Sequence, residues 1–319
     1  MPTPTDDASS REPMPPPGVL VNATLCIDTV EVPGVGRVDG VLGGAAAYFT
    51  AAARRYGPVR VLAAVGSDYP HDLWQKLQTL GGDLAGVARR PGRTFRWRGR
   101  YQPDLQNRDT LVVDFDPAVE AMPPLPPGWE ASAYVCLGVN APANQLRLRD
   151  SLPNTRLAVL DTIDLYVNQH RDDLLRAIAA ADGVVINDWE AARLTGHDDP
   201  AAAARRLLDL GVAFAVVKQG AAGSHLATPN DVWHCPACRV DRLVDPTGAG
   251  DSFLGAMLGH LAAHHASLHD PAALRHAVAH GTAAASFTIE AFSLDRWYHL
   301  TDAEHADRLA TLLTDAGLA

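Results

Sequence analysis

The sequence has few cysteines, no long apolar run and no block of like charge. Four cysteines in 319 residues are typical of a protein in the reducing cytoplasm. No apolar run approaches the roughly 20 residues that a helix needs to cross a bilayer, so no membrane partner is expected. The formal net charge is −10 with both signs scattered, which argues against a nucleic-acid partner. A polyphosphate ligand would therefore depend on backbone dipoles, metal ions and a few local cations.

Two groups of metal-ligand residue types lack the partners that a metal site needs. Cys235 and Cys238 form one CxxC, and no second CxxC completes a zinc tetrahedron. The pair lies in an extended stretch rather than at a helix start, where a redox pair gains a low thiol pKa. His260 and His264 have i,i+4 spacing without a third ligand nearby, so we interpret them as part of a solvent-facing surface.

Length and periodicity indicate one large α/β domain with an appendage. The chain is 47% hydrophobic, which suffices for a substantial core. Residues 1–17 are rich in proline, serine and charge and lack an apolar signal segment, so we expect a disordered tail and a cytoplasmic protein.

Short apolar runs alternate with helical patterns along most of the chain. Runs that are apolar on both faces and joined by helices indicate a mostly parallel sheet covered on two sides. The expected strands are 19–25, 59–66, 133–139, 156–162, 183–187 and 214–220, and the expected helices are 144–152, 172–182 and 200–211.

Two segments without helical period, 26–42 and 94–117, predict a small β lid, the second containing a hairpin. The main α/β domain then comprises 18–25, 43–93 and 118–319. The predicted fold class is an α/β protein, an αβα sandwich with a mostly parallel central sheet and a small β lid.

The stretch "DPTGAGDSFLGAM" (245–257) carries the strongest chemical signal. Leu254, Met257, Leu258 and Leu261 have helical spacing, which places a helix start near residues 250–252. A helix start offers unpaired N–H groups to an anion, and small residues leave room for a phosphate to approach.

Asp251 is the unusual residue in this stretch because a carboxylate cannot help to bind a phosphate. An ionised carboxylate beside a γ-phosphate can accept the proton of an attacking hydroxyl. The alternative is an ordinary helix start, in which a first-turn acid contributes only about 0.3–1 kcal/mol.

"DPTGAGDSF" resembles the C-terminal signature of the PfkB/ribokinase family of carbohydrate kinases. "GGAAAYFTAAARRYG" (43–57) resembles the N-terminal signature of that family, and "NDWEAARLTG" (187–196) and "VVKQGAAGSHLA" (216–227) also fit it. The resemblance spans roughly residues 20–292 in the right order. It implies a ribokinase-like sandwich with a β lid, ATP and Mg²⁺ as cofactors, and phosphorylation of a hydroxyl of a sugar, polyol or nucleoside.

The resemblance also implies roles for residues that match the family's motifs. Asp251 would be the general base. The N–H groups of Gly248, Ala249 and Gly250 would form the anion hole.

Five further residues would serve the nucleotide and its metal. Asn187 and Glu190 match the family's NxxE, which organises Mg²⁺ and phosphates through water, although the same pair also reads as a helix capping box. Lys218, Gly220 and Gly223 would line the nucleotide side.

The substrate side is expected at Asp28, Gly43 and Gly44, with Asn140 a weaker candidate. The family often has an asparagine on the helix after the Gly-Gly pair, and this chain has Tyr48 there. Tyr48 could stack on a ring or narrow the pocket, so ribose itself is a less secure substrate.

Asp245 and Thr247 lie where related enzymes build a monovalent-cation loop, so K⁺ is a further expected cofactor. Ala291 stands where many relatives have glycine, which weakens the case for potassium activation.

The lid leaves two questions open. The arginines Arg96, Arg98 and Arg100 could favour a phosphorylated substrate, or they could face solvent. A homodimer through the lid is also expected.

The function expected is an ATP-dependent kinase, and a nucleoside kinase rather than a free-sugar kinase is one alternative. A non-catalytic sugar- or nucleotide-binding protein on the same fold is a remote alternative. A dinucleotide-dependent oxidoreductase is disfavoured because "GVGRVDG" (34–40) is not a GxGxxG motif.

Overall fold

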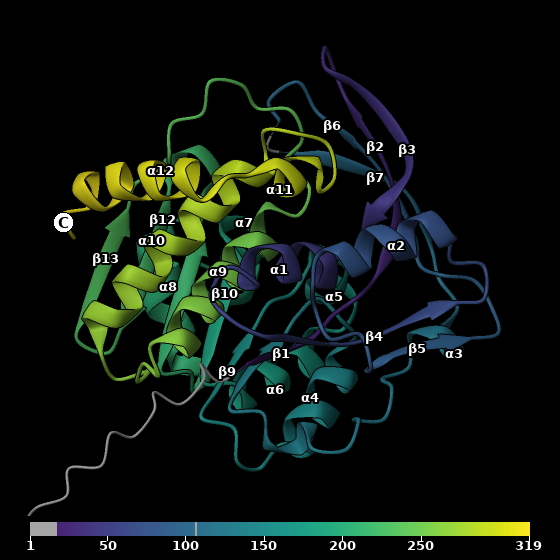
Figure 1. The fold of residues 1–319 in the computed structure, drawn as a ribbon. Helices are drawn as coiled ribbons and strands as arrows, with labels where there is room; N and C mark the ends of the chain where they lie inside the picture. Colours follow the sequence, from purple (N-terminus) through teal and green to yellow (C-terminus); the bar gives the residue numbers. More distant parts are fainter. Residues whose placement is uncertain (1–17, 106) are drawn as a thin grey trace, which may run out of the picture.

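A nine-stranded sheet forms the centre of the computed structural model, which describes residues 18–105 and 107–319 (Figure 1). The tail expected at 1–17 lies outside the described residues. The strand order is β13-β12-β11-β10-β9-β8-β1-β4-β5, parallel from β11 to β5 and antiparallel at β12 and β13. The strands are β1 (Val19–Asn22), β4 (Val59–Gly66), β5 (Val87–Arg90), β8 (Tyr134–Leu137), β9 (Leu157–Leu160), β10 (Gly183–Asn187), β11 (Phe214–Lys218), β12 (Ser224–Thr228) and β13 (Asp231–Cys235).

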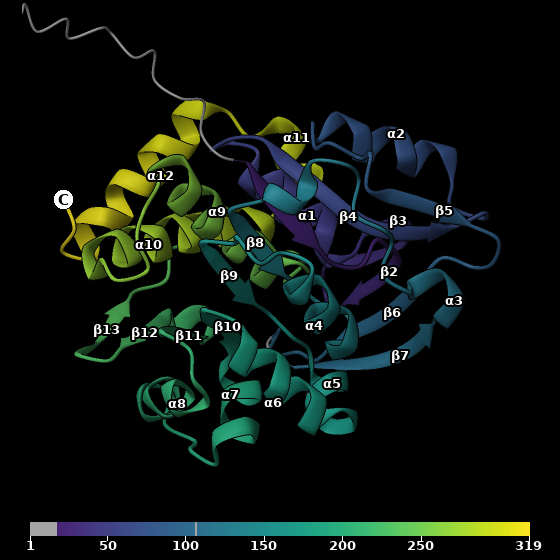
Figure 2. The same cartoon turned by 90° about the horizontal axis from the view of Figure 1, so that it is seen from below.

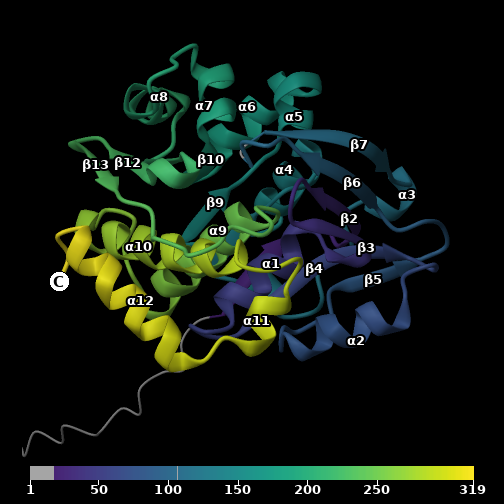
Figure 3. The ribbon, with the colours of Figure 1, turned by 90° about the horizontal axis from the view of Figure 1, so that it is seen from above.

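Helices cover both faces of this sheet (Figures 2 and 3). One layer contains α1 (Ala45–Ala53), α2 (His71–Thr79), α9 (Ala249–Ala263), α10 (Pro271–Thr288), α11 (Asp295–His299) and α12 (Asp302–Asp315). The other contains α4 (Pro142–Asp150), α5 (Asp164–Gln169), α6 (Arg171–Ala180), α7 (Asp188–Thr195) and α8 (Pro200–Leu207), and the short α3 (Pro117–Glu120) precedes β8.

The two layers bury two apolar clusters. Val19 and Val21 of β1 belong to the cluster under α1, α9 and α10, whereas Leu20 between them belongs to the cluster under α4, α6 and α8. Successive side chains of a strand point to opposite faces, so the doubly apolar runs of the sequence produce a sheet buried on both sides.

A second, four-stranded sheet forms the lid, with strand order β3-β2-β6-β7 (Figure 1). Its strands are β2 (Cys26–Val32), β3 (Gly36–Gly43), β6 (Arg96–Tyr101) and β7 (Arg108–Asp114). β2 and β6 run parallel, and the two outer pairs are antiparallel. Val30, Val32 and Tyr101 pack with Phe292 of the main body, so the lid has a small core of its own.

The predicted fold class is confirmed, and the differences are local. The sequence pattern does not predict β5, β12 or β13, because these short strands at or next to the edges of the sheet have mixed polarity. α9 begins at Ala249, slightly before the predicted start.

Three expectations about absent features can be compared with the structure. Cys235 ends β13, and it and Cys238 are free thiols. Within the described ranges, no set of three or more ligand-type side chains could hold a metal ion. No helix in the same ranges is long and apolar enough to span a membrane. His264 is exposed, whereas His260 is half-buried and stacks on His280 of α10 with ring centroids 3.9 Å apart.

Candidate active site

Polar residues gather at the carboxyl ends of β9, β10 and β11. Asp161 follows β9, Asn187 ends β10 and Lys218 ends β11, directly opposite Asn187 in the ladder. Open parallel sheets place ligands at this edge, beyond the carboxyl ends of the strands.

The start of α9 faces the same edge. Gly248 precedes the helix with φ of 78°, a left-handed conformation that favours glycine, and a Cβ there would lie 2.3 Å from the ring of Tyr48. The N–H of Ala249 donates to the carbonyl of Pro246 at 3.2 Å. In the described part of the chain, the N–H groups of Gly248 and Gly250 have no hydrogen-bond partner, so they are available to an anion.

Asp251 lies in the first turn of α9, beside these amides. Burial, together with the charges of Asp161 and Asp28, raises the pKa of Asp251 to about 7 against the opposing effect of Lys218 and Arg108. A carboxylate with a pKa near neutrality can hold and release a proton at physiological pH. This environment is the one that a general base requires.

Lys218 approaches the anion site from β11. A Cβ on Gly250 would lie 2.8 Å from Nζ of Lys218, so the ammonium occupies the space that this glycine leaves open. The same Nζ lies 3.5 Å from Oδ2 of Asp161. The small residues at the start of α9 therefore leave room for the side chain of Lys218 as well as for a bound phosphate.

Asn187 and Glu190 form the capping box of α7. Oδ1 of Asn187 accepts from the N–H of Glu190 at 2.8 Å, and Oε2 of Glu190 accepts from the N–H of Asn187 at 3.0 Å. Burial raises the pKa of Glu190 to about 8, with Asp161 adding to the shift. In the described chain Oε1 of Glu190 has no hydrogen-bond partner. The capping role thus leaves one carboxylate oxygen available.

The remaining nucleotide-side candidates are two glycines after β11. Gly220 is exposed, and a Cβ there would meet open space. Gly223 is buried with φ of 89°, and a Cβ would lie 2.1 Å from the carbonyl oxygen of Cys235. The packing of β13 therefore explains Gly223 without a ligand.

The candidates on the substrate side lie where β2 and β3 meet α1. The carboxyl of Asp28 lies against Gly43, where a Cβ would be 1.9 Å from Oδ2, and it accepts a hydrogen bond from the backbone of Gly44. Burial raises the pKa of Asp28 to about 7.

Two other candidates on this side make mostly internal contacts. Tyr48 is 1% exposed and its ring packs on Gly248. Asn140 accepts hydrogen bonds from the N–H of Ala141 and the side chain of Asn144 at 2.8 Å each, and its own amide donates to Asn22.

Asp245 and Thr247 stand between the lid and the last part of the chain. Oδ1 of Asp245 accepts from the N–H of Thr247 at 2.9 Å, whereas Oδ2 is buried without a hydrogen-bond partner among the described residues. The carbonyl of Ile289 accepts from the N–H groups of Val244 and Asp245. Ala291 is not among the residues with positive φ, so its backbone does not require glycine.

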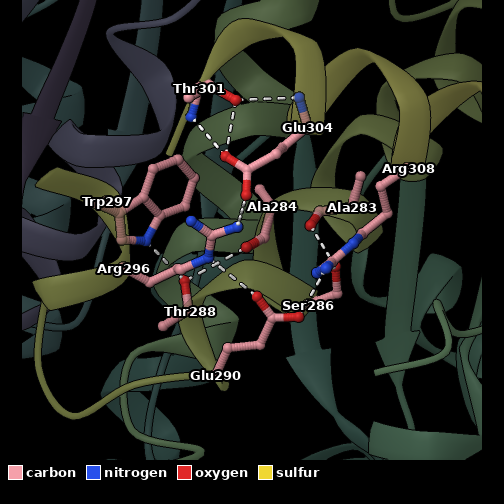
Figure 4. Close-up of polar contacts among 10 residues, drawn as sticks. All are labelled: Ala283, Ala284, Ser286, Thr288, Glu290, Arg296, Trp297, Thr301, Glu304 and Arg308. Carbon is pink, nitrogen blue, oxygen red and sulfur yellow. Dashed lines mark hydrogen bonds and ion pairs between the residues drawn. The ribbon is translucent and has the colours of Figure 1, made fainter. Parts of the chain in front are cut away.

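Helices α11 and α12 hold this last loop in place (Figure 4). Glu290 pairs with Arg296 at 3.1 Å and with Arg308 at 2.6 Å. Trp297 donates to the hydroxyl of Thr288, which donates to Ser252 in the first turn of α9 at 2.7 Å. The C-terminal helices therefore stabilise the segment on which Asp251 lies.

Several polar contacts join the lid to the main body, and two of them lie near the candidate site. The hydroxyls of Tyr101 and Thr247 share a hydrogen bond of 3.1 Å, and Arg108 lies 3.9 Å from Asp164 at the start of α5. Arg108 also stacks over Trp97, with its guanidinium carbon 5.7 Å from the ring centroid.

Two of the three lid arginines of β6 have acidic partners, whereas Nε of Arg98 is buried without a hydrogen-bond partner among the described residues. Arg96 pairs with Asp68 at 2.8 Å and Arg100 with Glu31 at 3.0 Å, both partly exposed. These two contacts favour the solvent-facing interpretation over binding of a phosphorylated substrate.

The sequence analysis did not identify Asp161 and Arg108. Asp161 lies inside the predicted strand 156–162, and the observed strand β9 ends one residue before it, which places Asp161 at the ligand edge of the sheet. Nothing local in the sequence links it to Lys218. Arg108 follows the lid turn, and its contact with Asp164 depends on how the lid rests on the body.

Comparison with known proteins agrees with this geometry. Residues 149–296 match the model of the pfkB family carbohydrate kinases. This part of the chain is similar to the PfkB-family carbohydrate kinases. The resemblance noted in the sequence is thereby confirmed, and with it the class of enzyme, a phosphotransferase with an alcohol group as acceptor.

Two curated relatives align with this PfkB kinase over much of its length. A cytidine kinase of Thermococcus kodakarensis is 29% identical over 245 residues, which are 75% of this chain and 87% of that protein. An aminoimidazole riboside kinase of Salmonella typhimurium is 29% identical over 190 residues, 60% of this chain and 51% of that protein.

Solved structures show the ribokinase-like fold. A fructokinase from Vibrio cholerae, crystallised with fructose, ADP and calcium, superposes with a TM-score of 0.75 at 20% identity, covering 92% of this chain and 99% of that one. A nucleoside kinase from Methanocaldococcus jannaschii superposes with a TM-score of 0.72 at 19% identity, covering 93% and 99%.

Gly250→Val is expected to weaken ATP binding and turnover together, each by at least about tenfold, because the side chain would displace Lys218 and cover the helix start. Calorimetric titration with ATP and steady-state kinetics measure both effects. Ala263→Val, at the other end of α9, is the matched control and should leave both unchanged. Wild-type kinetics in Gly250→Val would remove the anion site from the active centre.

Proposed function

We propose that this PfkB kinase transfers the γ-phosphoryl group of ATP to a hydroxyl of a sugar, polyol or nucleoside bound beneath the lid. The observation that carries the proposal is the carboxylate of Asp251 beside the free N–H of Gly250, with Lys218 on one side. On the other side, the buried Asp28 acts on the same carboxylate and provides an acceptor for a substrate hydroxyl. Asp28, Gly43 and Gly44 are thus proposed for the substrate side.

The reaction follows from the positions of these groups. The substrate hydroxyl oxygen bonds to the γ-phosphorus, the bond from that phosphorus to the bridging oxygen breaks, and ADP leaves. The hydroxyl proton passes to Asp251, whose raised pKa suits the transfer. The amides at Gly248 and Gly250 and the ammonium of Lys218 stabilise the negative charge on the phosphoryl oxygens. Tyr101 and Arg108 hold the lid down, and closure excludes water that would hydrolyse ATP.

The buried carboxylates fit the magnesium ion that the kinase family implies. These carboxylates do not form a complete metal site by themselves in the described residues, so the phosphates and water would supply further ligands. Asp161 acts electrostatically on both Glu190 and Asp251, burial raises the pKa of all three, and Lys218 ion-pairs with Asp161. An excess of buried negative charge favours a divalent cation. Glu190, through its free oxygen and an intervening water, and Asn187 would hold Mg²⁺ with the phosphates. The ion would neutralise charge on the phosphoryl oxygens.

Asp245 is the proposed site of a monovalent cation. Its Oδ2 is buried and has no hydrogen-bond partner in the described ranges, an arrangement that is costly without a counter-charge. Calcium or potassium ions are present in the fructokinase structures to which the fold is similar.

A nucleoside is the acceptor we favour over a free sugar. The cytidine kinase aligns with 75% of this chain. Trp97 and Tyr101 belong to the apolar cluster of the lid, and Tyr101 reaches the main body at Thr247, so the lid carries aromatic rings that could pack on a base. Because Tyr48 packs on Gly248, it narrows the pocket floor rather than standing free to stack.

We also propose a homodimer through the lid. β7 is an outer strand of the lid sheet, and Leu111, Val112, Val113 and Phe115 are 41–43% exposed. An apolar edge strand with unpaired backbone groups is suited to pairing with the same strand of a second copy.

The free cysteines are consistent with the cytoplasmic location expected from the sequence.

Asp251→Asn is expected to lower kcat by at least about a hundredfold while ATP affinity is retained, because the amide cannot accept the hydroxyl proton. In the wild type, kcat/KM should rise with pH through about 7 and level off above it, because the base must be ionised. Steady-state kinetics across pH measure both. Near-wild-type turnover in Asp251→Asn would refute the base assignment.

A coupled ADP-release screen over nucleosides, ribose, fructose, inositol and their monophosphates tests the acceptor. We expect release with a nucleoside. ATP binding without release for any acceptor would indicate a non-catalytic binding protein. Equal rates in potassium and tetramethylammonium chloride would contradict the cation at Asp245.

Sedimentation velocity tests the lid dimer. The wild type should sediment as a dimer at micromolar concentrations and Val112→Lys as a monomer with unchanged thermal stability. A monomeric wild type would overturn the proposed interface.

A further inference from the structure

A buried ion pair crosses the sheet edge above β10. Asp161 follows β9 and Lys218 ends β11, and β10 lies between these two strands. Oδ2 of Asp161 lies 3.5 Å from Nζ of Lys218, and the side chains are only 6% and 16% exposed. Removing two charges from water costs free energy that their mutual attraction does not always recover. A functional role would explain why this pair is buried.

The carboxylate of Asp161 is held in one orientation. The N–H of Asp161 donates to the carbonyl of Leu137 at 3.0 Å, and its carbonyl accepts from the buried amide of Gln145 at 2.9 Å. Oδ1 accepts from the N–H of Thr162 at 2.9 Å, which leaves Oδ2 to face Lys218. The acidic partner of the pair is therefore the rigid one.

Lys218 is the flexible partner, and its ammonium stands over the phosphate site. A lysine has four rotatable methylenes and no fixed donor geometry of its own. Its Nζ lies 2.8 Å from where a Cβ of Gly250 would be, directly over the first turn of α9. The ion pair with Asp161 fixes this position.

We propose that Asp161 is a positioning residue, which holds the ammonium of Lys218 over Gly250 and acts on phosphoryl transfer through that lysine. The inference rests on the proposed function, and it concerns a residue outside the family motifs recognised in the sequence. An acidic residue that fixes a phosphate-binding lysine is also required in protein kinases, on an unrelated fold.

The pair also influences Asp251. The charged groups that act on this carboxylate are Asp161 from the end of β9, Lys218 from β11, Asp28 from β2 and Arg108 from β7. Tyr48 of α1 and Cys136 of β8 are neutral neighbours at ordinary pH, because burial raises the pKa of both. Asp161 and Lys218 act in opposite directions, so removing each should shift the titration of Asp251 oppositely.

Asp161→Asn, Asp161→Glu and Lys218→Met test the proposal in the full-length protein. We expect kcat to fall at least about tenfold in all three, because Lys218 is displaced or missing, while the ATP dissociation constant of Asp161→Asn stays within about threefold. The acid limb of kcat/KM should move to lower pH in Asp161→Asn and to higher pH in Lys218→Met, by about half a pH unit or more. Asp161→Glu keeps the charge, so its limb should stay in place although kcat falls.

Asp173→Asn is the matched control, since it removes an exposed carboxylate that pairs with Arg176 on α6, and it should change neither readout. A lower kcat in Asp161→Asn with an unmoved acid limb would indicate a merely structural role and overturn the proposal. A limb that moves in the same direction in Asp161→Asn and Lys218→Met would also overturn it.

A titration of ¹³C-labelled aspartate carboxyls by NMR, assigned with Asp251→Asn, gives a readout that needs no acceptor. Opposite shifts of the Asp251 titration in Asp161→Asn and Lys218→Met would support the pair, and an unchanged titration in both would contradict it. A wild type that phosphorylates no acceptor would refute the proposed function, and the NMR titration would still decide the role of Asp161.

Discussion

Buried negative charge at the start of α9 is the constraint on which the site depends. Asp28, Asp161, Glu190 and Asp251 are carboxyl groups whose pKa values burial raises, and the ammonium of Lys218 ion-pairs within this group. Such a site is poorly matched to a bare polyphosphate, because the anion would meet carboxylates as well as amides. It is well matched to a nucleotide that arrives with its metal ion, since the ion offsets charge on both sides.

The packing around α9 makes this charged site rigid. Tyr48 of α1 fills the space beside Gly248, and Phe49 packs so closely on Gly255 that a Cβ there would lie 2.4 Å from its carbonyl oxygen. On the far side, Thr288 holds Ser252, and Glu290 is held by two arginines of the last helices (Figure 4). The catalytic segment is therefore fixed from both neighbouring helices and from the C-terminal part of the chain.

The lid is a separate sheet that contacts the main body through side chains. Its polar contacts include Tyr101 with Thr247, Arg108 with Asp164 and Arg96 with Asp68. Side-chain contacts can break and re-form, which suits an enzyme that must open for substrates and close to exclude water. Tyr101 contacts Thr247, whose N–H donates to Asp245, so a hydrogen bond connects the lid with the loop proposed to bind a monovalent cation.

Local pattern predicted much of this architecture, and contacts between distant segments accounted for the rest. The strands predicted at 59–66 and 183–187 match β4 and β10 residue for residue. Short runs that are apolar on both faces are typical of parallel strands buried on both sides. The sequence analysis offered two interpretations of Asn187 and Glu190, and the structure contains one of them, the capping box. Its two partners are only three residues apart, so local sequence was enough to predict it. The sequence did not predict β12 and β13, because their residues are of mixed polarity. They become strands by hydrogen bonding in turn to β11 and to each other, which is a contact between separate segments.

Local sequence was enough to place the start of α9 near residues 250–252, close to its observed start at Ala249, since small residues followed by a carboxylate and an apolar period are properties of adjacent positions. It also determined the layered fold through the apolar runs of its strands. The tertiary structure decided which charges meet. Strand order brings Asp161 to Lys218, and the closed lid brings Arg108 to Asp164. Electrostatic interaction depends on distance in space and on burial, and neither is a property of neighbouring residues in the chain.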